Sequence, residues 1–342
     1  MNREIQIFDV LNIQPEPEHY ILDEPLQKAV EMALRFNQPL LLTGEPGTGK
    51  TQLAFKVAHQ LHKQTEGNAE MCFAPTPLRF NTKTTSQARD LFYIYDAIGH
   101  FQQANTRRTD AGKEEILPLA NFIELQALGK AIALANPNLK EYRSKFKFDY
   151  PDDVKPSSSV VLIDEVDKAP RDFTNDILNE IENREFFVKE QDNYHIGLDL
   201  GLKDDKGKDT KNTQRILIIM TSNSEKNLPE AFLRRCVFYN IPTPKGEPLR
   251  KILKEHLSKK TGKALDANLK TITEEFEQLR EKVTRKKPAT AELVAVVKLL
   301  ALEDKFFSEA IKDVKAEFRD NLSLLVKTRE DIEALREFLE IP

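Results

Sequence analysis

The sequence is poor in the features that mark secreted, membrane-spanning or metal-binding proteins. Its two cysteines, Cys72 and Cys236, lie far apart without metal-ligand spacing, which indicates buried thiols in a reducing compartment and no zinc site. The first residues contain no basic segment followed by an apolar stretch. No run approaches the roughly 20 apolar residues that a membrane span needs. These absences predict a cytoplasmic protein.

A strong net charge, internal repeats and low-complexity tracts are also missing. The formal net charge of -4 provides no global attraction to nucleic acid or an anionic membrane, although it remains compatible with a local basic patch. The 342 residues are 40% hydrophobic and 31% charged, which suits a globular chain with a buried core. This length predicts one main domain and a smaller second one.

Five strand candidates predict the main domain to be an α/β fold. They lie at residues 40–42, 78–81, 160–163, 215–221 and 237–241. The apolar runs among them, at 40–42, 160–163 and 216–219, do not alternate with polar residues, which indicates a parallel sheet covered by helices on both faces. Helical patterns at residues 24–37 and 51–64 flank the first run.

The rest of the chain divides into an insertion and a helical C-terminal part. Residues 83–158 have helical patterns near 86–103 and 116–135, and we interpret them as a helical insertion in a core that spans 1–245. Residues 199–212 mix glycines with both charge signs, which favours an exposed loop or hairpin tip. The patterns at 249–260, 265–282 and 289–302 predict an all-helical domain over 246–342.

A glycine-rich segment, GEPGTGKT, lies between the first strand and the helix after it. It fits the phosphate-binding pattern G-x-x-x-x-G-K-[ST], in which glycines let backbone N–H groups approach the phosphates. Lys50 would pair with the outer phosphates, and the Thr51 hydroxyl would ligate Mg²⁺. The predicted nucleotide contacts are Gly44, Glu45, Pro46, Gly47, Thr48, Gly49, Lys50, Thr51 and Gln52.

An acidic pair follows the third apolar run, in VVLIDEVDKAP. Asp164 would hold a magnesium-bound water, and Glu165 would polarise the attacking water, which favours hydrolysis over simple phosphate binding. Taken alone, the pair reads as a solvated strand end, but the upstream phosphate loop favours the functional interpretation. We interpret Asp167 and Lys168 as a local surface pair.

Further candidates follow the fourth run. Asn223, in IIMTSNSE, would hydrogen-bond the γ-phosphate or the attacking water, although Asn is also an ordinary turn former. Arg234 and Arg235, in LPEAFLRRC, have no obvious acidic partner nearby in the sequence. A guanidinium supplied across a subunit boundary would stabilise the charge on the transferring phosphoryl group, and a surface arginine is the alternative.

The motifs GEPGTGKT, LIDEVDKAP, TSN and LPEAFLRRC follow one another in an order that resembles the AAA+ superfamily, with phrasing similar to MoxR-like ATPases. The resemblance implies a P-loop NTPase core with a helical lid, binding ATP and Mg²⁺ in a homo-oligomeric ring, usually a hexamer. It further implies a Walker A loop at residues 44–51 and a Walker B pair at Asp164 and Glu165. Asn223 would be the sensor 1 residue, and Arg235, or alternatively Arg234, would be the arginine finger. Tyr20 and Ile21 would contact the adenine.

Two features depart from this resemblance. MoxR-like proteins usually carry a sensor 2 arginine at the start of a lid helix, where KKPATAELV has Ala291 and Glu292. Arg285, Lys286 or Lys287 are the candidate substitutes. The long separation between Lys50 and Asp164 indicates that the insertion is particular to this branch.

Three functions compete. The resemblance implies a chaperone-like ATPase that remodels a protein client, with a von Willebrand A-domain protein as candidate partner. A restriction-type nucleic-acid motor would need basic or aromatic pore loops; residues 199–212 instead balance four lysines against four aspartates, while Arg107, Arg108 and Lys113 keep this alternative open. A P-loop kinase would have no use for Asn223 and the two arginines. The absence of an N-K-x-D sequence favours ATP over GTP.

Overall fold

The computed structural model describes residues 16–68, 70–110, 119–148, 150, 155–198, 212–224, 228–257 and 260–341, with the backbone alone for 104–110. Two compact units are found: a core unit, Leu22–Pro242, and a helical unit, Met1–Ile21 with Thr243–Pro342. The sequence-based division into 1–245 and 246–342 differs at the start of the chain, because the short helix η1 (Pro17–His19) packs against α9 (Gly246–His256). None of the described helices is both long and apolar enough to cross a membrane.

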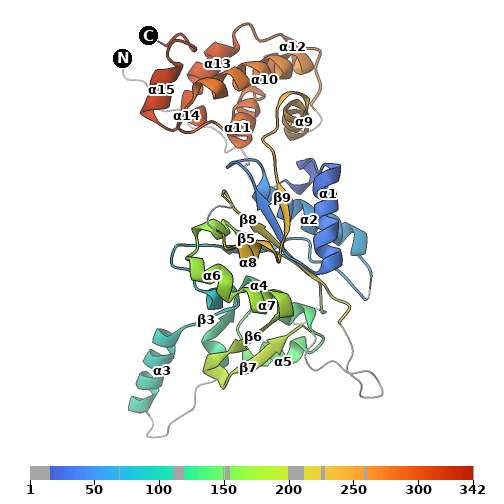
Figure 1. The fold of residues 1–342 in the computed structure, drawn as a ribbon, viewed down its shortest axis with the longest axis vertical. Coiled ribbons are helices and arrows are strands. Elements are labelled where there is room, and N and C mark those ends of the chain that lie inside the picture. Colours follow the sequence, from blue (N-terminus) through green and yellow to red (C-terminus); the bar gives the residue numbers. More distant parts are fainter. Residues whose placement is uncertain are drawn as a thin grey trace. The chain divides into compact units, whose positions relative to one another are not determined.

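A five-stranded parallel sheet forms the centre of the core unit (Figure 1). Its strands follow the order β2-β5-β8-β1-β9 and comprise β1 (Leu40–Thr43), β2 (Leu78–Asn81), β5 (Ser159–Asp164), β8 (Ile216–Thr221) and β9 (Val237–Asn240). The three inner strands are buried along their whole length, whereas the edge strands β2 and β9 alternate between half-buried and exposed residues. The parallel sheet predicted from the apolar runs is confirmed.

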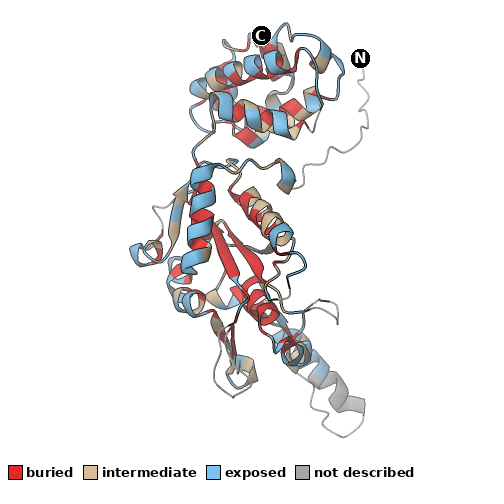
Figure 2. Ribbon diagram, turned by 90° about the vertical axis from the view of Figure 1, so that its right-hand side faces the viewer, coloured by how far each residue is buried: buried red, intermediate tan, exposed pale blue. Residues whose placement is uncertain are grey.

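Helices cover both faces of this sheet, and the inner strands are buried between them (Figure 2). One face carries α1 (Glu24–Phe36) and α2 (Lys50–Thr65). The Asp23 side chain starts α1 by accepting the N–H of Leu26 at 2.9 Å. The other face carries α4 (Ala127–Ala135), α6 (Arg171–Asp176), α7 (Leu178–Asn183) and α8 (Glu230–Leu233). Because the strands are parallel, the carboxyl-terminal ends of β1, β5 and β8 all lie at the same end of the sheet.

The insertion is not purely helical, which corrects the prediction for 83–158. After η2 (Ala88–Leu91), β3 (Tyr93–Tyr95) pairs antiparallel with β4 (Ile123–Leu125), and α3 (Ala97–Asp110) and η3 (Leu119–Asn121) lie between them. Burial alternates along each strand, as in β3, where Tyr93 is buried and Ile94 is exposed, and aromatic and β-branched residues favour such half-buried strands. The helices α4 and α5 (Leu139–Lys145) then return the chain to the sheet.

A second hairpin went unpredicted. It pairs β6 (Glu185–Val188) with β7 (Tyr194–Gly197) around η5 (Lys189–Gln191). The ring of Phe186 stacks on Phe92, with 5.0 Å between centroids, so this hairpin packs on the insertion. The mixed-charge segment predicted as a loop or hairpin tip lies outside the described residues, except for Asn212.

The cysteines are half-buried rather than fully buried. Both Cys72 and Cys236 are free thiols. Burial raises the pKa of the Cys236 thiol to about 12, so this group is unreactive at neutral pH.

The helical unit has its own apolar core. Its main helices are α9, α10 (Leu265–Lys282) and α11 (Thr290–Leu300), followed by α12 (Lys305–Ser308), α13 (Val314–Asp320), α14 (Leu322–Leu325) and α15 (Arg329–Leu335). Leu253, Phe276 and Val296 are among the side chains that pack together there. The prediction of a helical region after the sheet is confirmed.

A charged cluster fastens η1 within this unit. His19 Nδ1 lies 2.8 Å from Glu16 Oε2, the Lys298 ammonium lies 3.5 Å from the same oxygen, and the rings of His19 and His256 are 6.0 Å apart. Burial and the nearby Lys298 lower the pKa of His256. Although two histidines and a glutamate are metal-ligand types, a cation here would face the Lys298 ammonium, which already pairs with Glu16.

Candidate active site

The loop between β1 and α2 is shaped by its glycines. Gly44 has φ 138 and Gly49 has φ 89, which are conformations that favour glycine. A Cβ atom at Gly44 would lie 2.5 Å from the carbonyl oxygen of Ile241, so no larger residue fits. The loop ends where α2 begins, and the free N–H groups of this helix terminus suit bound phosphate.

Lys50 lies folded over this loop. Its Nζ donates to the carbonyl oxygens of Gly44 at 2.8 Å and Glu45 at 2.9 Å, and the residue is buried. Burial lowers the pKa of Lys50, while the carboxylates of Asp167 and Asp164 act in the opposite direction. The loop carbonyls thus hold the ammonium group at the place where outer phosphates would replace them.

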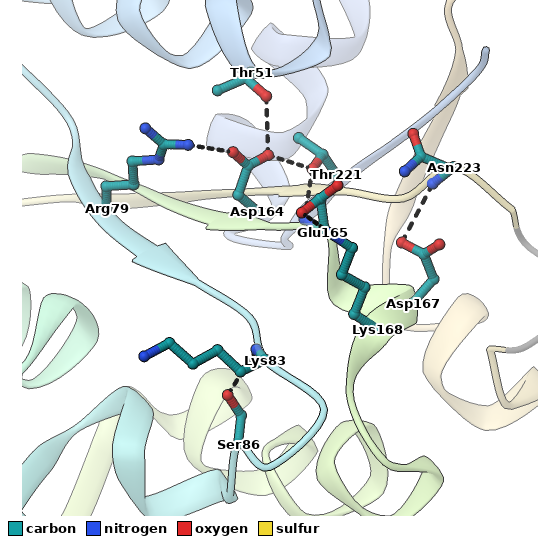
Figure 3. A network of polar contacts seen from close by, with 10 residues as sticks. All are labelled: Thr51, Arg79, Lys83, Ser86, Asp164, Glu165, Asp167, Lys168, Thr221 and Asn223. Atoms are coloured by element: carbon teal, nitrogen blue, oxygen red, sulfur yellow. Dashed lines mark hydrogen bonds and ion pairs between the residues drawn. The ribbon is translucent and has the colours of Figure 1, made fainter. Parts of the chain in front are cut away.

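Asp164 is the centre of the polar network in Figure 3. Its Oδ1 accepts hydrogen bonds from the hydroxyls of Thr51 at 2.9 Å and Thr221 at 2.6 Å, and its Oδ2 accepts one from Arg79 at 2.9 Å. The residue is only 6% exposed. Elements far apart in sequence, namely α2, β2, β5 and β8, therefore converge on one carboxylate.

The pair Thr51 and Asp164 fits a magnesium site. Because Thr51 gives its hydroxyl hydrogen to Asp164, its oxygen lone pairs remain available to a cation. Mg²⁺ prefers such oxygen ligands and usually keeps several waters, which a neighbouring carboxylate can hold. The two predicted metal ligands therefore lie in contact beside the phosphate loop, and their role as ligands stays a prediction.

Glu165 follows Asp164 in a left-handed conformation, with φ 58. Its N–H donates to the Thr221 hydroxyl at 2.8 Å, so the same hydroxyl that binds Asp164 also holds the backbone of its neighbour. The Glu165 carboxylate is half-exposed and pairs with the ammonium of Lys168. This pairing corrects the prediction that Lys168 pairs with Asp167.

Asn223 lies just beyond the end of β8 and is exposed. Its backbone N–H donates to Asp167 Oδ1 at 3.3 Å, which draws the β8 end toward the segment after Glu165 (Figure 3). The structure therefore places the Asn223 backbone beside Asp167, two residues after Glu165, and a role for the Asn223 side chain stays a prediction.

Arg234 and Arg235 follow α8 and are both exposed. Both have acidic partners, contrary to the sequence-based expectation: Arg234 bonds Glu230, and Arg235 Nε lies 3.5 Å from Glu182. These are surface ion pairs, which contribute only about 0–1 kcal/mol. Either arginine is therefore held weakly.

The other predicted residues occupy different places. The Thr48 hydroxyl donates to the Glu45 carbonyl at 2.9 Å and closes the phosphate loop, in which Pro46 and Gly47 are exposed; Gln52 lies in the first turn of α2. Tyr20 and Ile21 belong to the helical unit, so the adenine contacts stay a prediction.

In the helical unit, the segment where the sensor 2 arginine was expected, residues 285–292, contains hydrogen bonds that cap a helix and hold a turn. Glu292 accepts the N–H of Ala289 at 2.8 Å and so caps α11. The preceding turn is held by Asp331, which accepts the N–H groups of Arg285 and Lys286 at 3.0 Å each. The side chains of Arg285, Lys286 and Lys287 are exposed.

Sequence reasoning missed two residues of the site, Thr221 and Arg79. Thr221 is the last residue of a buried strand that ends at the same edge as Asp164, and a polar side chain there was the available signal. Arg79 carried no such signal, because its contact depends on β2 being the neighbour of β5.

Comparison with known proteins agrees with this site. A model of the AAA domain, dynein-related subfamily (AAA_5), matches residues 39–236. No curated protein matches the chain. Similar solved structures include the FIGL-1 AAA domain in complex with ADP, with 16% identity, 92% of this chain and 88% of that chain covered, and a TM-score of 0.42.

A RuvB variant from Thermotoga maritima has 13% identity and a TM-score of 0.41, with 92% of this chain and 67% of that chain covered. A katanin from a study of self-assembly has 13% identity and a TM-score of 0.39, with 94% of this chain and 89% of that chain covered. The family match spans the phosphate loop, the acidic pair and both arginines. The chain therefore belongs to the dynein-related AAA domain family and is an AAA+ ATPase-type protein.

Proposed function

We propose that this protein hydrolyses ATP with Mg²⁺ and uses the reaction to remodel a protein client, as a MoxR-like chaperone ATPase. The observation that carries the proposal is the hydrogen bond of 2.9 Å between Thr51 and Asp164. It joins the phosphate loop to the end of a buried strand, directly before the carboxylate of Glu165. A site that only binds phosphate would need the loop but not the acidic pair.

The chain's own groups divide the work. Backbone N–H groups at the start of α2 and the Lys50 ammonium bind the β- and γ-phosphates, and Thr51 and Asp164 hold the magnesium ion and its waters. The ion supplies charge neutralisation on the phosphate oxygens. Glu165 orients a water for attack on the γ-phosphate and accepts its proton. Asn223 is the proposed sensor of the γ-phosphate.

For Glu165 to act as base, its carboxylate has to leave Lys168. The two side chains are 42% and 49% exposed, and a pair this exposed contributes only about 0–1 kcal/mol. Nucleotide binding can therefore release it at low cost.

We further propose a homo-oligomeric ring, a hexamer by family resemblance, in which Arg235 or Arg234 completes the site of the neighbouring subunit. Both arginines are exposed and weakly paired, as a group supplied in trans has to be. The Tyr20 and Ile21 pair is the proposed adenine contact, and a von Willebrand A-domain protein is the proposed partner.

Hydrolysis is tested by measuring phosphate release from ATP by wild type and Asp164→Asn, each with Mg²⁺ and with excess chelator. The proposal expects release only from the wild type with Mg²⁺. Release that is insensitive to the chelator or to the substitution would contradict the assignment.

A nucleic-acid motor is the alternative use of the same site. DNA or RNA added at low and at moderate salt separates the two, because phosphate contacts weaken steeply with salt. A salt-sensitive rise in ATP hydrolysis favours the motor, and no response favours a protein client.

A further inference from the structure

Arg79 places a fixed positive charge beside the carboxylate assigned to the metal. Its guanidinium donates to Asp164 Oδ2 at 2.9 Å (Figure 3). Arg79 sits two residues before Asn81, the residue that pairs with Asp164 in the β2–β5 register, so its side chain extends forward along the strand to reach the carboxylate. Ordering a long side chain costs rotamer entropy, which a specific contact has to offset.

The two oxygens of Asp164 have different partners. Oδ1 accepts two neutral hydroxyls, from Thr51 and Thr221, whereas Oδ2 accepts the charged guanidinium. The Asp164 side chain is 9% exposed and that of Arg79 is 46% exposed, so the pair has one buried and one solvated partner. With Oδ2 bonded to the guanidinium, Oδ1 is the oxygen that accepts the Thr51 hydroxyl.

Charge balance differs with and without nucleotide. Lys50 lies on the loop carbonyls and Arg79 lies on Asp164, so a free Mg²⁺ ion would meet two cations. A bound triphosphate supplies several negative charges and further oxygen ligands. Magnesium sites in such proteins rely on phosphates besides one or two carboxylates.

We propose that Arg79 is a positioning residue that occupies Asp164 in the absence of nucleotide, so that the site takes up Mg²⁺ only together with ATP. This inference rests on the proposed ATP site and adds a role for a residue outside the phosphate loop and the acidic pair. Arg79 acts through the orientation and charge of Asp164, its hydrogen-bond partner.

The test is a titration of the full chain with Mg²⁺ in the absence of nucleotide. Binding is measured by calorimetry and by the shift in the midpoint of thermal unfolding. The variants are Arg79→Gln, which removes the charge, and Arg79→Lys, which keeps it. The matched control is Lys28→Gln, which removes an exposed charge of α1 that pairs with Glu24. Arg79→Gln is expected to bind free Mg²⁺ about tenfold or more tightly than wild type, because a nearby like charge is gone.

Arg79→Lys and Lys28→Gln are expected to match wild type. In the double variant Arg79→Gln with Asp164→Asn, the gain has to disappear. The proposal is overturned if Arg79→Gln binds free Mg²⁺ no more tightly than wild type, if Arg79→Lys behaves like Arg79→Gln, or if the gain survives Asp164→Asn.

These outcomes are separable from the proposed function. If wild type hydrolyses ATP but Arg79→Gln leaves Mg²⁺ affinity unchanged, only the role of Arg79 fails. If wild type does not hydrolyse ATP, the titration still measures whether Arg79 and a cation compete for Asp164.

Discussion

The Thr221 hydroxyl accepts a hydrogen bond from the backbone N–H of Glu165 at 2.8 Å and donates one to Asp164 Oδ1 at 2.6 Å. Glu165 is left-handed there, a conformation that costs a residue with a side chain about 1–2 kcal/mol. In this conformation the Glu165 N–H reaches Thr221 at the end of β8, and the hydrogen bond offsets part of the strain. One buried side chain thus fixes both members of the acidic pair.

Thr221→Val is expected to lower the rate of ATP hydrolysis by about ten- to a hundredfold, since misplacing a catalytic group by about 1 Å has an effect of this size. The valine keeps the shape of threonine but leaves the Glu165 N–H without its acceptor. ATP affinity should change little, because Thr221 bonds neither the loop nor Lys50. Steady-state hydrolysis and nucleotide titration measure the two effects.

Thr221→Ser is the matched control, since it keeps the hydroxyl, and it should retain most of the activity. Equal activity in the valine and wild-type proteins would rule out a positioning role for this hydroxyl.

Arg235→Ala is expected to abolish hydrolysis while changing the free energy of unfolding by no more than about 0.5 kcal/mol, because the side chain is exposed. Mixing this variant with Lys50→Ala should restore part of the activity, since a mixed ring contains sites with an intact Lys50 and a neighbour's intact Arg235. Arg234→Ala provides the comparison. No recovery at any mixing ratio would count against a finger supplied in trans.

Asp331 is expected to stabilise the helical unit in a pH-dependent way. Burial raises its pKa, but the Thr328 hydroxyl and the N–H groups of Arg285, Lys286 and Thr284 outweigh this and lower it from 3.8 to about 2. Because the folded value lies below the unfolded one, the stabilisation is present above pH 3.8 and is lost as pH falls toward 2.

Asp331→Ala should therefore lower the free energy of unfolding at neutral pH by about 3 kcal/mol, the effect of removing charged hydrogen bonds. The difference from wild type should narrow below about pH 4, as denaturant unfolding at several pH values would measure. A difference that stays constant down to pH 2 would contradict the assignment.

Arg184 is a buried cation whose removal should stabilise the core unit. It is 2% exposed, its NH2 group donates to the Asn37 carbonyl at 3.1 Å, and within the described residues its Nε and NH1 atoms have no hydrogen-bond partner. Burial lowers its pKa to about 10. Replacing buried charges by apolar residues of similar size is often neutral or stabilising by about 1–4 kcal/mol.

Arg184→Met is thus expected to raise the free energy of unfolding at pH 7. Because the folded pKa lies below the unfolded one, wild type should recover part of this difference as pH rises above 10. A loss of stability in the methionine variant would show that the hydrogen bonds to the carbonyl and side-chain oxygens of Asn37 outweigh desolvation.

The sequence was most informative where function depends on local pattern. The phosphate loop needs Gly44, Gly49 and Lys50 at fixed spacing, and continuous apolar runs identified the three inner strands of the sheet. Asp164 was recognised because it ends one of these runs. Each of these signals lies within a few residues of the feature that it predicts.

Features that depend on contacts between distant segments were missed. The bonds of Arg79 and Thr221 to Asp164 require the order β2-β5-β8, and Glu182 reaches Arg235 from another helix. The strands β3 and β4 have three residues each and are separated in the sequence by helical residues. The prediction therefore followed the stronger helical periodicity and assigned helices to this segment.

The most direct test of the account is ATP binding and hydrolysis by Glu165→Gln, measured side by side on one preparation. Glutamine keeps the size of the side chain but cannot accept the water's proton, while Lys50, Thr51 and Asp164 remain. Glu165→Gln is expected to bind ATP with wild-type affinity in the presence of Mg²⁺ and to hydrolyse it at least about a hundredfold more slowly than wild type. Hydrolysis near the wild-type rate by Glu165→Gln would contradict it.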